Sequence, residues 1–216
     1  MKLIDDKTTA LHHILQCRVR GYECWTSFTI DLEKLEAKRR QIEEQFGTRL
    51  PPWKRQDRKQ MGLPTGVAVA VHVTGEPMKR QVVVLATDLA LRAPAGSPWT
   101  RERWRQNPPE VDCFVMVKEP RVRGDFAWTW KLQERTYQRL AHLLTTAVKR
   151  GDAHEVDLHC RTWVRLFPMV RGVRRQMRGL IRSAEKLWTA TQRREWPTLT
   201  SDLLPAQIGF RPTPNE

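Results

Sequence analysis

The chain has 216 residues and carries 38 Lys and Arg against 24 Asp and Glu, which gives a formal net charge of +14. This length is enough to bury a substantial core and corresponds to one or two domains, so we expect one compact domain with attached arms. A charge of this size indicates an anionic partner, with nucleic acid as the first candidate. Arginine outnumbers lysine by 27 to 11, which favours phosphate recognition through paired hydrogen bonds, although a GC-rich genome would also raise the arginine count.

Several classes of protein are excluded by simple patterns. The first residues, Met1 to Asp6, do not combine a basic segment with an apolar one, so we expect no secretory signal there. No run of about 18 apolar residues occurs, and we therefore expect no membrane span. The four cysteines are scattered and never form a Cys-x-x-Cys pair, which is typical of reduced thiols in a cytoplasmic protein.

Residues 1–48 read as an N-terminal helical segment. Apolar spacing predicts a helix that ends near Val19, a short strand over residues 24–30, and a second helix over residues 31–46 that Gly47 terminates. The second helix alternates acidic and basic residues, which is typical of a solvated face. We assign no chemistry to it.

Residues 49–65 change in character, because prolines and glycines flank a basic stretch that contains one aromatic residue, Trp53. The composition predicts a mobile basic linker or arm. A plain linker and an arm that tracks phosphates are equally consistent with this pattern. The cations that would contact phosphate in the second case are Lys54, Arg55, Arg58 and Lys59.

Residues 66–133 form the predicted sheet region, since the apolar residues here recur at every second position. The expected strands cover residues 67–73, 81–85, 113–117 and 126–132. With helices before and after it, the pattern predicts an α+β fold. We expect a roughly four-stranded antiparallel sheet packed with N-terminal helices and a C-terminal helical segment.

The last predicted strand places Phe126, Trp128, Trp130 and Leu132 on one face. The stretch from Arg123 to Trp130 faintly resembles the RNP1 strand of RNA-recognition modules, in which spaced aromatics stack on bases. It departs from that pattern, because Asp125 is an extra residue and no RNP2-like aromatic strand is present. We therefore favour a core face over a stacking face.

Residues 134–196 predict a C-terminal helical region, with helices over 134–150 and 153–166 and a third from Met169 to Trp188. Residues 197–216 contain several prolines and predict an irregular tail.

The third of these helices is the most informative stretch of the chain. Wound at about 100° per residue, it gathers its apolar residues on one face, namely Val170, Val173, Met177, Leu180, Ile181, Ala184, Leu187 and Trp188. The opposite face is basic and consists of Arg171, Arg174, Arg175, Arg178, Arg182 and Lys186. Glu185 is the only acidic residue between Arg161 and Arg194. A solvated face is the ordinary explanation, but a row of one sign gains nothing from i,i+4 ion pairs, so we favour a helix that binds polyanions.

Catalytic and cofactor motifs are missing from the sequence. No Walker loop, dinucleotide-binding glycine fingerprint or nucleophile elbow occurs, and we expect no cofactor and no bound metal. His12, His13, Cys17 and Cys24 do not complete a zinc ligand set. Neither do His154, His159 and Cys160, and acids near strand ends such as Asp88, Asp112 and Asp125 are commonplace. A metal-independent endoribonuclease needs only a histidine beside Arg or Lys, and six histidines are available.

The leading hypothesis is therefore a non-enzymatic nucleic-acid-binding protein, with slight preference for DNA over RNA because the aromatic strand reads as core. The basic helix and the arm would contact phosphates, and Arg121 and Arg123 at a hairpin would add a third contact. The alternatives are the endoribonuclease, built on an RNA-recognition-like sheet, and a basic subunit of a larger nucleoprotein assembly. A membrane surface ranks last. The Arg- and Trp-rich composition gives an impression of plasmid, phage or conjugative-element proteins, although no motif supports a mobile element as the source.

Overall fold

The computed structural model describes residues 2–4, 6–73, 75–87, 105, 107–120, 124–168 and 170–197. The predicted α+β class is confirmed. Contacts divide the chain into two compact units, Met1–Lys131 and Leu132–Glu216. Each unit is described by itself below.

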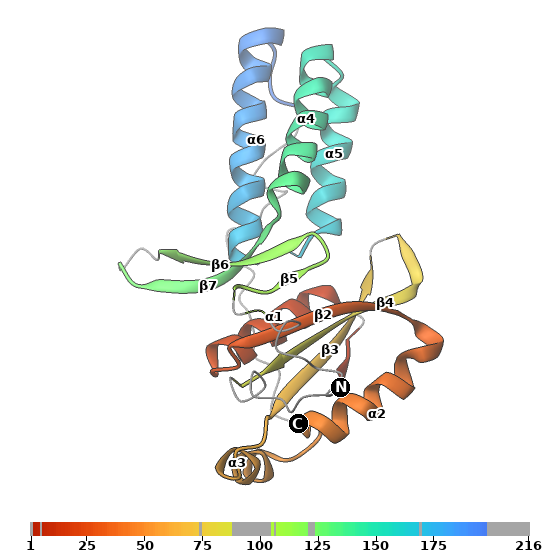
Figure 1. Ribbon diagram of the computed structural model, residues 1–216. Coiled ribbons are helices and arrows are strands. Elements are labelled where there is room, and N and C mark those ends of the chain that lie inside the picture. Colours follow the sequence, from red (N-terminus) through yellow and green to blue (C-terminus); the bar gives the residue numbers. More distant parts are fainter. Residues whose placement is uncertain are drawn as a thin grey trace. The chain divides into compact units, whose positions relative to one another are not determined.

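The first unit is built on a four-stranded sheet in the order β1-β3-β4-β2 (Figure 1). These strands are β1 (Lys2–Leu3), β2 (Cys24–Asp31), β3 (Gly66–Val73) and β4 (Glu76–Ala86). β4 lies antiparallel to both neighbours, and the short β1 pairs in parallel with β3. The strand expected over residues 24–30 is therefore a full edge strand of this sheet.

Helices cover this sheet because both of its faces are apolar. Side chains of α2 (Leu35–Phe46), which follows the 3-10 turn η1 (Leu32–Lys34), pack with every second residue of β3 and β4, among them Ala68 and Val84. The helix α1 (Lys7–Val19) contacts β3 and β4 and buries Leu11 and Ile14. α1 and α2 lie on opposite faces of the sheet (Figure 1).

The remaining strands form a second sheet of β5 (Glu110–Val111), β6 (Phe114–Pro120) and β7 (Phe126–Leu132) in that order. The single four-stranded sheet expected from the sequence is thus divided into two. The reason lies in β4, which is already paired along both edges, with β3 and β2. It has no edge left for β6.

Within the segment 49–65, residues Pro52–Gln60 form the helix α3, which the sequence analysis did not predict. Pro52 suits a first helical position, since its missing N–H would have no partner there. α3 has no buried residue. Its attachment to the rest of the unit is polar, as described below.

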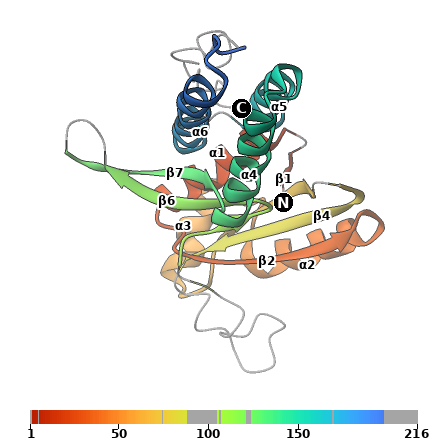
Figure 2. The ribbon, with the colours of Figure 1, turned by 90° about the horizontal axis from the view of Figure 1, so that it is seen from above.

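The second unit contains three helices that lie side by side (Figures 1 and 2): α4 (Glu134–Arg150), α5 (Ala153–Leu166) and α6 (Arg171–Gln192). α4 contacts both α5 and α6. Gly151 ends α4 in the left-handed conformation, and the Asp152 carboxylate then accepts the Glu155 backbone N–H at 2.9 Å to start α5. The expected third helix begins at Arg171, after Pro168 and Val170, and ends four residues beyond Trp188.

No helix among the described residues is both long and apolar enough to cross a membrane.

Candidate nucleic-acid interface

The apolar face of α6 fixes which side of the helix is exposed. Six of the eight predicted apolar residues are buried, namely Val173, Met177, Leu180, Ile181, Ala184 and Trp188, whereas Val170 and Leu187 are half-buried. Gln176 makes two further contacts within the unit, because its side-chain amide accepts the Leu132 N–H at 2.8 Å and donates to the Leu132 carbonyl at 3.2 Å. These contacts set the rotation of α6 and leave its opposite face outside.

The six predicted basic residues all lie on that outer face. Arg171, Arg175, Arg182 and Lys186 are exposed, and Arg174 and Arg178 are half-buried. We call this set the basic row. Arg171 and Lys186 are 15 steps apart along the helix, so a rise of 1.5 Å per residue gives the row a length of about 22 Å.

The spacing within the basic row brings like charges together. Arg174, Arg178, Arg182 and Lys186 follow one another at intervals of four residues, so each cation lies one helical turn from the next. Like charges at this spacing destabilise a helix by roughly 0.2–0.5 kcal/mol per pair. In the described part of the chain, no ion pair includes Arg178, Arg182 or Lys186. Stability of the helix does not explain the row.

The charges at the two ends of α6 do not stabilise the helix either. Its first turn contains no acidic residue and its last turn no basic one, and the N-cap Val170 supplies no side-chain hydrogen bond. The helix dipole favours the reverse placement, with acids at the amino end and bases at the carboxyl end. The positive charge of the basic row and the positive end of the dipole therefore add together, which favours an anionic ligand.

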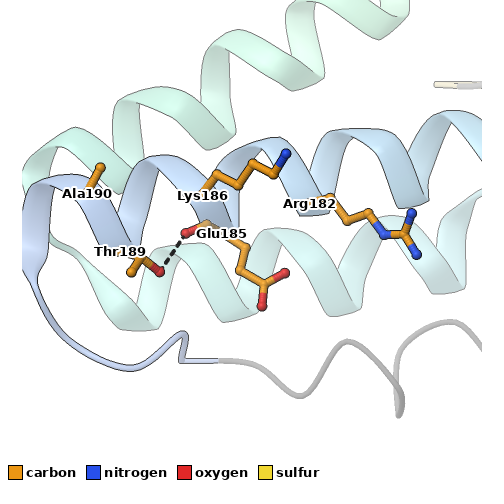
Figure 3. A pocket seen from close by; sticks show the side chains of 5 residues that line it. All are labelled: Arg182, Glu185, Lys186, Thr189 and Ala190. Atoms are coloured by element: carbon orange, nitrogen blue, oxygen red, sulfur yellow. Dashed lines mark hydrogen bonds between the residues drawn. The ribbon is translucent and has the colours of Figure 1, made fainter.

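A shallow, open depression of about 520 Å³ adjoins the basic row and is lined by Arg182, Glu185, Lys186, Thr189 and Ala190 (Figure 3). All five residues belong to α6, so the depression is a feature of one helix surface. Thr189 donates its hydroxyl to the Glu185 carbonyl at 3.0 Å. A surface of this form suits an extended ligand better than a small molecule, which requires concave walls on several sides.

The four predicted cations of α3 divide into two pairs. Arg58 donates to the Gln45 carbonyl at 2.8 Å and to the Pro64 carbonyl at 3.4 Å, and Arg55 lies 3.4 Å from the Tyr22 hydroxyl. These two guanidinium groups are half-buried and attach α3 to the unit. Lys54 and Lys59 are exposed, over the rings of Trp53 and Tyr22 at 5.1 and 5.7 Å.

The basic row belongs to the second unit and α3 to the first. Arg121 and Arg123, the remaining predicted contacts, lie outside the described residues, as do Asp88 and the tail beyond Pro197.

Two cation–aromatic contacts of the first unit were missed by the sequence reasoning. The Lys118 ammonium lies 5.9 Å from the ring centroid of Phe126, and the Arg18 guanidinium lies 5.5 Å from that of Trp128. The period-two pattern places both rings on one face of β7, but it carries no information on whether other parts of the chain cover them.

Candidate catalytic groups are dispersed. The six histidines occur on α1, β3, α4 and α5, and burial lowers the pKa of His12. Burial also raises the pKa of Cys113 to about 11 and that of Cys160 to about 12, which keeps both as thiols at neutral pH. Within the part of the chain that the structure describes, no group of three or more His, Cys, Asp and Glu is placed to hold a metal ion.

The chain was compared with protein-family models, curated proteins and solved structures, and none of them matches it.

Proposed function

We propose that the protein binds nucleic acid and that the basic row of α6 contacts the phosphate backbone. The observation that carries this proposal is the one-sign outer face of α6, on which Arg178, Arg182 and Lys186 form no ion pair within the described residues. Each guanidinium group can donate two parallel hydrogen bonds to the oxygens of one phosphate. A bound polyanion would also offset the repulsion between neighbouring cations of the row.

Contacts of this kind predict affinity that depends strongly on salt and little on base sequence. If all six residues of the row neutralise a phosphate, log K falls with log salt with a slope of about −5 on duplex DNA. Lys54 and Lys59 of α3, both exposed, would add a second contact. Arg121 and Arg123 would add a third.

The slight preference for DNA rested on the aromatic strand being core. Phe126 is 59% exposed, which removes that reason. DNA and RNA are therefore both candidate ligands. The competing proposal, a basic subunit that seats on an acidic protein, predicts weak binding to every nucleic acid.

The test is fluorescence anisotropy of the full chain with labelled single- and double-stranded DNA and RNA, titrated with salt. The decisive variant is Arg178→Glu/Arg182→Glu, which reverses two central charges of the row. The matched control is Lys34→Glu/Arg40→Glu, which makes the same charge change at exposed positions of η1 and α2, next to acidic residues.

The α6 variant should bind about a hundredfold more weakly at low salt, because two phosphate contacts become repulsive, and its salt slope should be shallower by about 2. The control should retain most of the affinity. Equal losses in the two variants would show that net charge alone governs binding. Weak binding by the unsubstituted protein to all four ligands would instead favour an acidic protein partner.

A further inference from the structure

One face of β7 changes from core to surface along its length. At one end Trp130 is 1% exposed and donates its indole N–H to the Leu11 carbonyl at 2.7 Å. Two residues earlier Trp128 is half-buried, and two residues before that Phe126 is 59% exposed. Among the Phe and Trp residues that the structure describes, only Phe126 and Trp53 are exposed. The aromatic face of β7 therefore extends beyond the hydrophobic core, and packing in the core does not explain why an aromatic residue stands at position 126.

Cations from two other elements lie over the exposed part of this face. Lys118 of β6 lies over Phe126 and Arg18 of α1 over Trp128, at 5.9 and 5.5 Å. Arg18 also donates to the Glu23 carbonyl, which holds its guanidinium in place. The rings and the cations come from three elements of the first unit, so the arrangement is a property of its fold.

The spacing of the two rings suits successive bases. Residues i and i+2 of a strand share a face and lie about 6.7 Å apart. That separation lets each ring stack on a neighbouring base of an extended strand, while flanking cations take the phosphates. Bases of a duplex are already stacked and paired, so their faces do not reach such a surface.

From this geometry we infer that Phe126 and Trp128 form a second nucleic-acid site, which stacks unpaired bases and selects single strands. Lys118 and Arg18 supply its positive charge. The inference rests on the proposed function in one respect, because it takes the ligand to be a nucleic acid. Its residues lie in the first unit and are independent of the basic row.

The experiment uses the full-length protein and three labelled ligands of equal length: an oligothymidylate, an abasic strand that keeps the sugar-phosphate backbone, and a duplex. Phe126→Ala removes a ring that is 59% exposed and is not part of the buried core. Phe126→Tyr is the matched control, since it keeps an aromatic surface. Circular dichroism checks that each variant is folded.

Phe126→Ala should weaken oligothymidylate binding about tenfold, because one base loses its stacking partner. Its affinity for the abasic strand and the duplex should equal that of the unsubstituted protein, and its salt slope should not change, because no phosphate contact is lost. Phe126→Tyr should bind all three ligands normally.

The inference is overturned if Phe126→Ala binds the oligothymidylate as tightly as the unsubstituted protein does, or if it loses the abasic strand and the duplex to the same extent. The charge-reversed α6 variant separates this outcome from failure of the proposed function. Loss of oligothymidylate binding in Phe126→Ala alone would support the site formed by Phe126 and Trp128 and reject the basic row. Loss in the α6 variant alone would do the opposite.

Discussion

The helices α3 and α6 are both rich in basic residues, but they use them in different ways. α6 packs through an apolar face that includes Met177 and Trp188, which leaves its guanidinium groups outside. α3 has no buried residue, and the guanidinium of Arg58 attaches it to the carbonyls of Gln45 and Pro64. α6 therefore keeps its cations on its outer face, whereas α3 uses part of its charge for attachment and exposes only Lys54 and Lys59 of its four predicted contacts.

The largest expected effect comes from a substitution that removes a buried side chain from the apolar face of α6. Met177→Ala should destabilise the second unit by about 2–5 kcal/mol, because a buried side chain is lost and a cavity remains. Met61→Ala, the same change at the 66% exposed residue that ends α3, should cost little. Urea unfolding followed by circular dichroism measures both. Similar losses in the two variants would break the comparison.

A smaller effect is expected from the attachment of α3. Arg58→Ala should destabilise the first unit by about 1–2 kcal/mol, since the Gln45 and Pro64 carbonyls lose their donor. Proteolysis within residues 49–65 should become faster. Lys59→Ala, at an exposed position of the same helix, is the control and should leave unfolding unchanged. If Arg58→Ala instead lowers nucleic-acid affinity without changing stability, Arg58 is a ligand contact after all.

The smallest effect has the opposite sign. Arg182→Glu should stabilise α6 by roughly 0.5 kcal/mol, because a carboxylate between Arg178 and Lys186 replaces two repulsions by attractions. The same variant should bind nucleic acid more weakly. Thermal unfolding at low salt and anisotropy measure the two effects, with Arg182→Gln as the uncharged control. A loss of stability in Arg182→Glu would mean that Arg182 supports the helix rather than a ligand.

Sequence reasoning succeeded where a periodic pattern also decides burial. In α6, apolar residues at intervals of three and four predicted an apolar face, and that face is the one buried in the structure. α3 was missed because it has no apolar face, although Pro52 and the good helix formers Lys, Arg and Gln pointed to it.

Information that depends on the rest of the fold could not be obtained from local patterns. The strands divide into two sheets because β2 and β3 already pair with both edges of β4. This pairing joins residues that are far apart in the sequence, so local patterns do not reveal it. Alternation likewise placed Phe126 and Trp130 on one face, but only their surroundings make the first exposed and the second buried. The candidate site was predicted from charge alone, and the exposed rings enter it only as a proposal drawn from the fold.

The uniform sign of the basic row also bears on the speed of encounter. Its field extends about 10 Å into a solution of 0.1 M salt before it is screened, and it draws polyanions in from many directions. On the proposed function, association would be fast and would slow as salt is added, whereas the time a ligand stays bound would depend on shorter-range contacts such as stacked bases. The association rate would then depend mainly on the basic row of the second unit, and the lifetime of the complex on the aromatic rings of the first unit.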